Sequence, residues 1–171
     1  MSKREVINFN TEWLYIPENL ACGCEKTIDE SKFELVSVPH ANTILKHHKG
    51  DEGRSFLNDI EDYRFISCYR KHFTLGEEYK GKKVRVRFEA VATVAQVFVN
   101  GNYVGGHKGA YTPFELDITD HLLFGEDNVI SVRVDSTQHK DIPPEGYQVD
   151  YCVFGGIVRN VSLIVTNKAY I

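Results

Sequence analysis

The sequence of 171 residues lacks several features that would assign it to a common functional class. It has no apolar run approaching the ~20 residues of a membrane-spanning helix, so we expect no membrane partner. Its 20 basic side chains nearly balance its 24 acidic ones, and its longest basic cluster is the short group from Lys82 to Arg87. Because nucleic-acid binding needs a basic patch, we also expect no nucleic-acid partner.

Signals for secretion, disulfides and metal binding are weak as well. Residues 1–10 lack the apolar stretch of a secretory signal, so we expect a cytoplasmic protein. The four cysteines are Cys22, Cys24, Cys68 and Cys152. Their spacing is not that of a small disulfide scaffold, and we expect free thiols. A zinc site combining Cys22 and Cys24 with His40, His47 or His48 is disfavoured, because the Cys-x-Cys gap is tighter than in structural zinc sites. We predict no metal and no cofactor.

What the sequence does contain is alternation of apolar and polar residues with a period of two, the mark of half-buried strands. Val84, Val86 and Phe88 alternate with arginines in this way. Strands are expected over residues 33–38, 69–75, 84–90, 130–134 and 161–165. Asn100-Gly101 lies between two further apolar runs and predicts a type I′ hairpin, whose two central residues both need positive φ.

Helical signals are confined to one short segment, residues 119–123, which begins on capping residues and stops at Gly125. The sequence does not alternate strands with helices of 10 to 15 residues, which is the pattern that would indicate a parallel sheet. We therefore predict an all-β fold, an antiparallel β-sandwich of jelly-roll type with about eight strands. A single domain over residues 1–171 is expected, with residues 41–63 as a long surface excursion.

The segment from Ser136 to Gly156 is the best candidate for function, since it is long and has no alternation. Sugars are bound by aromatic faces and by carboxylates and amides that bond pairs of hydroxyls. The segment offers both kinds of group in Tyr147, Gln148, Asp150 and Tyr151. The structural alternative is that the tyrosines cover the open end of the sandwich and that Asp150 bonds turn amides.

A series of short motifs extends over nearly the whole chain. They are Trp13, Val38-Pro39-His40, residues 68–73, Val99-Asn100-Gly101, Tyr111-Thr112-Pro113-Phe114, residues 125–128, and Asp150 ahead of Gly155-Gly156-Ile157-Val158-Arg159. In this order and spacing they resemble the amino-terminal sugar-binding domain of glycoside hydrolase family two, which comprises β-galactosidases, β-glucuronidases and β-mannosidases.

The resemblance implies a galactose-binding-like jelly roll beside a catalytic barrel, in which an aspartate shortly before the Gly-Gly-Ile turn reaches the terminal sugar. Asp150 is the residue at that position. Asn100, Gly101, Gly155 and Gly156 match motif positions of the family, and we expect them to have an architectural role. Arg159 also matches, and we expect it to form a structural ion pair or a hydrogen-bond hub.

Members of that family are several times longer, and their two catalytic glutamates belong to the barrel, which is absent from this chain. Retaining hydrolysis needs two carboxyl groups roughly 5 Å apart. Glu145 and Asp150 share one loop, and Asp59, Glu61 and Asp62 lie in another, but charged loops of this kind are generally solvated. We predict no catalytic residue in this chain.

The expected function is therefore that of the sugar-binding domain of a β-glycosidase that hydrolyses O-glycosyl bonds. Its expected partners are a β-glycoside or terminal sugar and the downstream domains of the parent enzyme. One alternative is a stand-alone carbohydrate-binding module without catalysis, and another is a sandwich that binds a partner through an edge strand. The choice among galactoside, glucuronide and mannoside, and association into a homo-oligomer, stay open.

Overall fold

The computed structural model describes residues 4–20, 24–42, 64–143 and 154–168, and almost every regular element in these ranges is a strand. The strands are β1 (Glu5–Asn8), β2 (Trp13–Ile16), β3 (Glu34–Val36), β4 (Ile66–Thr74), β5 (Lys83–Phe88), β6 (Val94–Val99), β7 (Asn102–Lys108), β8 (Phe114–Asp117), β9 (Asp127–Asp135) and β10 (Val161–Thr166). Two single turns of 3-10 helix, η3 (Glu77–Tyr79) and η4 (Thr119–His121), complete the elements.

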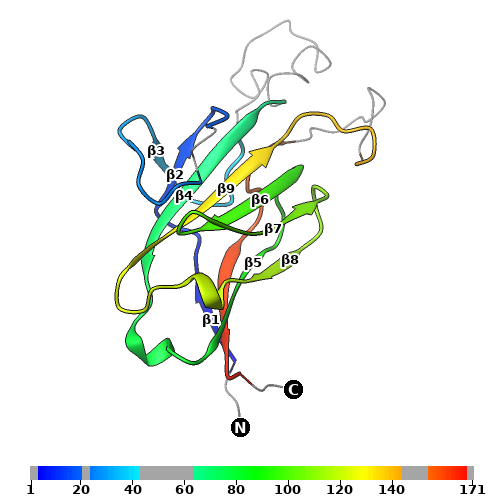
Figure 1. Cartoon of the computed structure of the whole chain (residues 1–171). Helices are drawn as coiled ribbons and strands as arrows, with labels where there is room; N and C mark the ends of the chain where they lie inside the picture. The colour runs from blue at the N-terminus through cyan, green and yellow to red at the C-terminus, as the bar shows by residue number, and fades with distance from the viewer. Residues whose placement is uncertain (1–3, 21–23, 43–63, 144–153, 169–171) are drawn as a thin grey trace, which may run out of the picture.

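The strands form two sheets that face each other (Figure 1). One sheet has four strands in the order β1-β10-β5-β8, and the other has six in the order β3-β2-β4-β9-β6-β7. All pairings between these strands are antiparallel. The predicted antiparallel jelly-roll sandwich is confirmed, and the described ranges contain ten strands rather than about eight.

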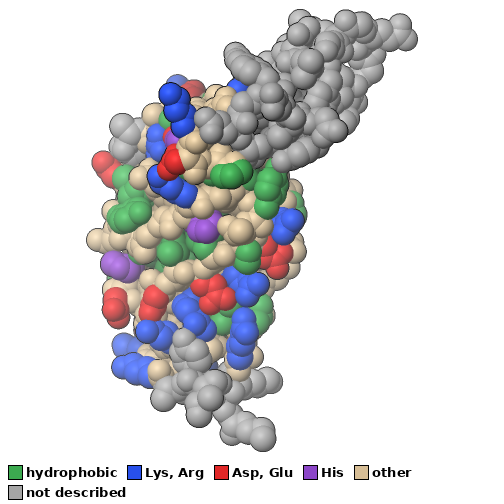
Figure 2. Space-filling model, turned by 90° about the vertical axis from the view of Figure 1, so that its right-hand side faces the viewer, with side chains coloured by type: hydrophobic (Ala, Val, Ile, Leu, Met, Phe, Trp, Pro, Cys, Tyr) green, Lys and Arg blue, Asp and Glu red, His purple; other side chains and the backbone are tan. Residues whose placement is uncertain are grey.

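The core lies between the sheets and follows the predicted alternation. Val84, Val86 and Phe88 of β5 are fully buried. The arginines between them, Arg85 and Arg87, point outward and form ion pairs with Glu115 on β8. Figure 2 shows charged side chains of both signs mixed on the lower part of the β7 and β8 side of the molecule. The arginines of the basic cluster noted in the sequence thus form ion pairs across neighbouring strands.

The predicted hairpin is confirmed between β6 and β7. Asn100 has φ of 49° and Gly101 has φ of 84°, the two positive values that the turn needs. Asn100 does more than form the turn, because its side chain accepts a bond from Val129 N and donates to His121 O and to Asn128 Oδ1. The hairpin is therefore fastened to the connection between β8 and β9.

The predicted helical segment over residues 119–123 is shorter in the structure. It is one 3-10 turn, η4, which joins β8 to β9 as expected and ends at His121. Thr119 Oγ1 bonds the side chain of Asp117 and the backbone of Val84, which ties the start of the turn to β5. No helix in the described ranges is long and apolar enough to cross a membrane.

Candidate functional site

The four predicted sugar contacts, Tyr147, Gln148, Asp150 and Tyr151, lie outside the described residues, as do both groups of loop carboxylates considered above. The structure does describe the attachments of residues 144–153, which follow Pro143 and precede Phe154. It also describes Asn42, which precedes residues 43–63. These attachments lie at one end of the sandwich, the upper end in Figure 1.

Gly155 and Gly156 connect these attachments to the sheets. Asn42 N donates to Gly155 O at 2.8 Å, and the backbones of Gly156 and Ala92 exchange two hydrogen bonds at 2.9 and 3.1 Å. Ser136, just after β9, donates its hydroxyl to Ala92 O at 2.7 Å. Four separate parts of the chain therefore meet at the Gly155-Gly156 turn, which we call the glycine junction (Asn42, Ala92, Ser136, Gly155 and Gly156).

Both glycines of this junction are required by close approach. A Cβ at Gly155 would overlap Ser136 Oγ and Asn42 Nδ2. A Cβ at Gly156, where φ is 110°, would lie 2.6 Å from both His40 O and the Tyr69 hydroxyl. The predicted architectural role of these two glycines is confirmed.

Below the junction is a buried group of aromatic side chains. His40 Nδ1 lies 2.9 Å from the Tyr69 hydroxyl, and Tyr15 packs against both rings at centroid distances of 4.7 and 4.9 Å. The Tyr15 hydroxyl donates to Asn42 O at 2.8 Å. The group thus supports the junction residue Asn42 through one hydrogen bond and Gly156 through direct contact.

Burial keeps this aromatic group uncharged. It raises the pKa of Tyr69 well above its ordinary value, and together with the charge of Glu34 it raises the pKa of Tyr15 to about 12. Burial also lowers the pKa of His40, although Glu34 opposes this. At neutral pH the three side chains are therefore a neutral support. His40 makes these contacts with Tyr15 on β2 and Tyr69 on β4.

Asp135 is a carboxylate at this end that the sequence analysis did not single out. It ends β9 and accepts bonds from Thr137 N at 3.0 Å and Thr137 Oγ1 at 2.6 Å. His139 Nε2 lies 3.5 Å from it. Burial acts to raise the pKa of Asp135, but the bonds from Thr137 and the charges of His139 and Arg133 outweigh it and lower the pKa. Asp135 is therefore an ionised turn former that fixes the start of the candidate segment.

One side chain differs from what the sequence suggested. Arg159 does not act as a hub: it is exposed, and within the described ranges it has no hydrogen bond or ion pair. A histidine that the sequence analysis did not single out, His107, stacks on Phe114 at a centroid distance of 4.6 Å and bonds Thr112 Oγ1 at 2.7 Å. It connects β7 to β8.

Sequence reasoning also missed a buried ionic network on the outer face of the six-stranded sheet. Arg70 on β4 is fully buried and bonds Glu30, the carbonyls of Glu25 and Lys26, and Ser131 Oγ. It holds residues 24–33 against β4 and β9. The sequence shows only two adjacent basic residues, Arg70 and Lys71, in a strand of mixed polar and apolar residues, and this pattern does not indicate burial.

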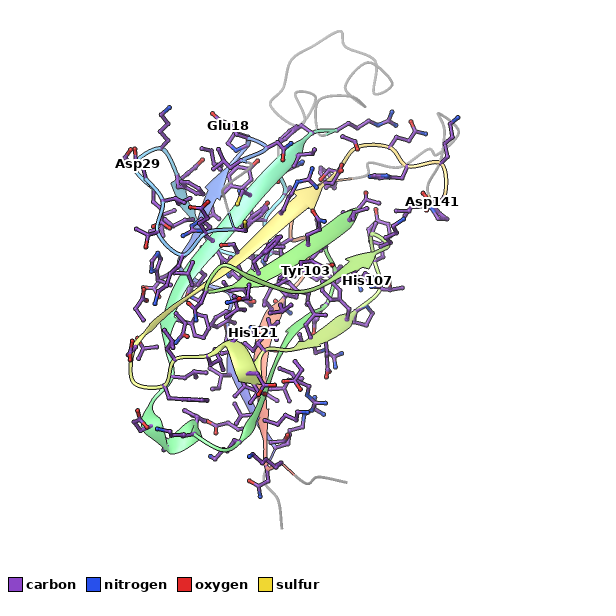
Figure 3. The ribbon with its side chains drawn as sticks, in the orientation of Figure 1. Glu18, Asp29, Tyr103, His107, His121 and Asp141 are labelled. Atoms are coloured by element: carbon purple, nitrogen blue, oxygen red, sulfur yellow. The ribbon has the colours of Figure 1, made fainter. Side chains whose placement is uncertain are left out.

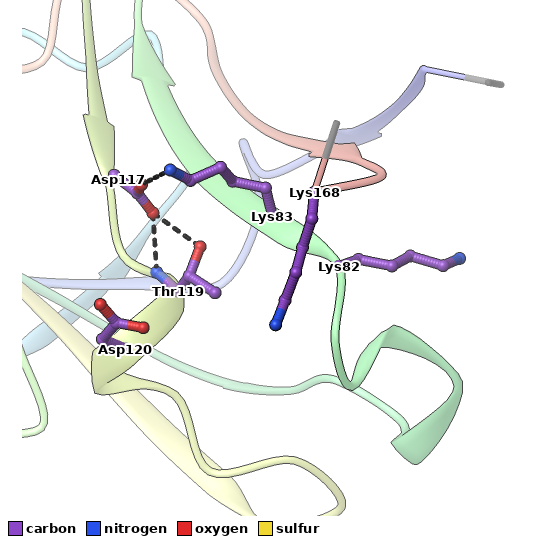
Figure 4. A pocket seen from close by; sticks show the side chains of 6 residues that line it. All are labelled: Lys82, Lys83, Asp117, Thr119, Asp120 and Lys168. Carbon is purple, nitrogen blue, oxygen red and sulfur yellow. Dashed lines mark hydrogen bonds and ion pairs between the residues drawn. The ribbon is translucent and has the colours of Figure 1, made fainter. Parts of the chain in front are cut away.

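A cavity of about 290 Å³ lies at the opposite end of the sandwich (Figure 4). Its lining residues are Lys82, Lys83, Asp117, Thr119, Asp120 and Lys168. Figure 4 shows Lys83 directed at Asp117, with Nζ and Oδ2 2.8 Å apart, while Lys82 points away. Among the residues that the structure describes, no group of three His, Cys, Asp or Glu side chains could hold a metal, and Cys24 and Cys68 are free thiols.

Comparison with known proteins assigns a class to this fold. The sequence model of glycosyl hydrolases family 2, sugar binding domain, matches residues 56–167. The structure superimposes on a β-glucuronidase of Bacteroides uniformis with a TM-score of 0.82 and 28% identity, over 96% of this chain and 18% of that one. Fold and sequence together define a β-sandwich sugar-binding domain.

Curated relatives agree with this class. A β-galactosidase of Thermoanaerobacter pseudethanolicus is 56% identical over 98% of this chain and 22% of its own length. A β-glucuronidase of Formosa agariphila is 31% identical over 99% of this chain and 18% of its own length. The chain belongs to the sugar-binding domain family of the family 2 glycosyl hydrolases. It spans about a fifth of the length of these relatives.

Proposed function

We propose that this domain supports the active site of a β-glycosidase and presents Asp150 to the terminal sugar of the substrate. Tyr147, Gln148 and Tyr151 add aromatic and amide contacts to the same sugar. The two catalytic carboxylates belong to a barrel domain of the same protein, outside this chain. The observation that carries the proposal is the glycine junction, which holds Ser136 before these four residues and Gly155 and Gly156 after them.

The junction matters because a sugar contact must be held in place to be useful in catalysis. Asp150 precedes Gly155 by five positions. Even a fully extended chain of that length spans only about 17 Å. Gly155 is fixed by Asn42 and has no room for movement toward Ser136. A rigid attachment of this kind is what positions a binding residue on a loop.

We further propose a β-galactoside as the substrate. The relative with 56% identity is named a β-galactosidase, whereas the β-glucuronidases given above are 28% and 31% identical. A galactoside also lacks the C6 carboxylate of a glucuronide, so its binding site needs no cationic side chain to pair with that group. The comparison of 4-nitrophenyl β-galactoside with 4-nitrophenyl β-glucuronide as substrates of the full-length protein tests this choice.

The test of the proposed role is the Asp150→Ala variant of the full-length protein. Loss of a hydrogen bond between a carboxylate and a sugar hydroxyl should lower kcat/KM for 4-nitrophenyl β-galactoside roughly 10- to 100-fold. Steady-state kinetics measures this, with circular dichroism to confirm that the variant is folded.

Asp141→Ala is the matched control, because Asp141 is an exposed carboxylate in the same connection and pairs with Lys108 on the surface. Its kinetics should equal those of the unmodified protein. If the Asp150 variant retains full kcat/KM, Asp150 is not a sugar contact. If both variants lose activity equally, the effect belongs to the connection as a whole, and the specific role of Asp150 is wrong.

A further inference from the structure

An exposed tyrosine lies on the outer face of the six-stranded sheet. Tyr103 on β7 is 57% exposed and meets Phe98 of β6 edge to face, with ring centroids 5.4 Å apart. Its hydroxyl lies 3.1 Å from the point that a Cβ on Gly106 would occupy. The ring therefore extends along β7 over a glycine, where no side chain lifts it away from the sheet. Figure 3 shows Tyr103 on this strand.

Polar side chains with unused hydrogen-bond donors lie next to this ring. The register places Gly106 opposite Gln96 and Gln96 opposite Arg133, in one row across the outer face. Neighbouring strands are about 4.8 Å apart, so Gln96 borders the hydroxyl end of Tyr103. Arg133 Nη1 donates to Gln96 Oε1 at 3.2 Å, and Arg133 Nε donates to Asn19 Oδ1 at 3.0 Å.

These bonds orient the two groups without using all their donors. Within the described part of the chain, the NH₂ of Gln96 and Nη2 of Arg133 have no hydrogen-bond partner. The Arg133 side chain is 29% exposed, so water or a ligand can reach it. An exposed aromatic ring thus adjoins an amide and a guanidinium that are held in fixed orientations and have donors to spare.

We propose that this outer face is a second carbohydrate-binding surface, which takes a β-linked oligosaccharide. The Tyr103 ring stacks on the C–H face of one pyranose unit, while Gln96 and Arg133 donate to its hydroxyl oxygens. The surface is formed by β6, β7 and β9 and does not include the candidate segment around Asp150. It would hold a polymeric or extended substrate near the enzyme independently of the active site.

The composition of the face favours a sugar over a protein partner. A stable protein interface buries about 800 Å² on each side and has a hydrophobic centre. Here Tyr103 is the one strongly exposed large hydrophobic side chain on β6, β7 and β9, as far as these strands are described. Its surroundings are charged, with ion pairs from Lys108 to Asp141 and from Arg133 to Asp135. One flat ring with a polar border matches one sugar unit.

The experiment is a ¹H–¹⁵N NMR titration of the full 171-residue chain with β-1,4-galactotetraose. The side-chain amide signals of Gln96 and the Nε signal of Arg133 should shift on binding. Tyr103→Ala should raise the dissociation constant about 10-fold or abolish binding, while Tyr103→Phe should preserve it because the ring face is retained. Tyr111→Ala is the matched control, since Tyr111 is also exposed but lies beyond the end of β7.

Three results would overturn the proposal. These are the absence of any shift at Gln96 and Arg133, binding that is unchanged in Tyr103→Ala, and signals at this face that respond to protein concentration instead of sugar. The result is separable from the proposed catalytic role. Tyr103→Ala should leave the hydrolysis of 4-nitrophenyl β-galactoside unchanged in the full-length protein, whereas Asp150→Ala should leave the titration at this face unchanged.

Discussion

Buried polar residues determine where the loops of this domain begin. Asn128 is fully buried at the start of β9 and makes four side-chain hydrogen bonds, two of them with the backbone of Leu123. The others are with Glu126 O and with the side chain of Asn100 in the β6–β7 turn. One amide thus joins the β8–β9 connection to a hairpin that is distant in sequence.

Replacement of Asn128 by alanine should be strongly destabilising. It leaves part-buried donors and acceptors of Leu123 and Asn100 without their partners, and such a loss costs about 2 kcal/mol of the free energy of unfolding. Urea unfolding followed by circular dichroism measures this. Asn102→Ala is the matched control, because Asn102 is exposed and its two bonds, at 3.2 and 3.4 Å, are long. Equal stability of the two variants would contradict the assigned role.

The segment of residues 24–33 is held on the sheet by charge. Glu30 accepts from Arg70 Nε at 2.6 Å and contacts His72 Nε2 at 3.1 Å. His72 Nδ1 lies 2.9 Å from Asp127 Oδ2 on β9. Burial lowers the pKa of His72, but the hydrogen bonds and charges of Asp127 and Glu30 outweigh it, so the pKa is raised above 6.5. When it is protonated, the imidazolium pairs with both carboxylates and joins the segment to β4 and β9.

This attachment should depend on pH. Because the folded-state pKa of His72 is above the unfolded value, its contribution to stability is complete below the unfolded pKa and is lost as pH rises through the folded pKa. The difference in free energy of unfolding between the wild type and His72→Gln should be larger near about pH 6 than near about pH 9. Urea unfolding at both values measures it.

The Glu30→Gln variant provides the control for this prediction. Glu30 supplies part of the raised pKa of His72, so the pH dependence of the His72→Gln difference should be reduced in that background. A difference that does not change with pH in the Glu30 wild type would show that the imidazole is not charged in the folded state.

Sequence patterns predicted the long strands better than the short ones. β5 has six residues with strict alternation, and β9 and β10 have apolar residues at every second position. The sequence therefore indicated which side chains of these strands are buried. β1 has four residues, none of them fully buried, and its strand conformation depends on pairing with β10. Such a strand has no periodic signal of its own. β2 and β8, also of four residues each, were not predicted either.

The sequence predicted the glycines beside the candidate segment but not the residues that support them. The two glycines of the junction were found because a family motif contains them. Asn42, Ser136 and Tyr15 were not found, because only the fold brings these small polar and aromatic residues together. Arg70 was equally hidden, since a basic residue in a strand is normally solvated and this one is buried by residues 24–33.

For the whole molecule, the sandwich has a rigid centre and weaker margins. β4 and β9 pair over nine residues in the middle of the six-stranded sheet. β3 has three residues and pairs with β2 alone, and β1 pairs with β10 alone. Figure 1 shows β4 and β9 extending toward the end that carries the glycine junction. The most stable part of the fold therefore reaches the candidate site.

Hydrogen exchange should reveal this gradient. Amides of β4 and β9 should exchange most slowly, through global unfolding, while those of β3 should exchange fastest among the strands, through local opening. Hydrogen–deuterium exchange with mass spectrometry at peptide resolution measures the order. Protection of β3 equal to that of β4 would contradict it.

The glycine junction also limits how this sequence can diverge. The space that a Cβ at position 155 would need is taken by Ser136 Oγ and Asn42 Nδ2. A larger residue at 155 therefore becomes acceptable only when positions 42 and 136 shrink with it, although 42 and 136 are 94 positions apart (136 − 42). Substitutions at the three sites should be epistatic, and an evolutionary path through this region has to change them together or leave all three as they are.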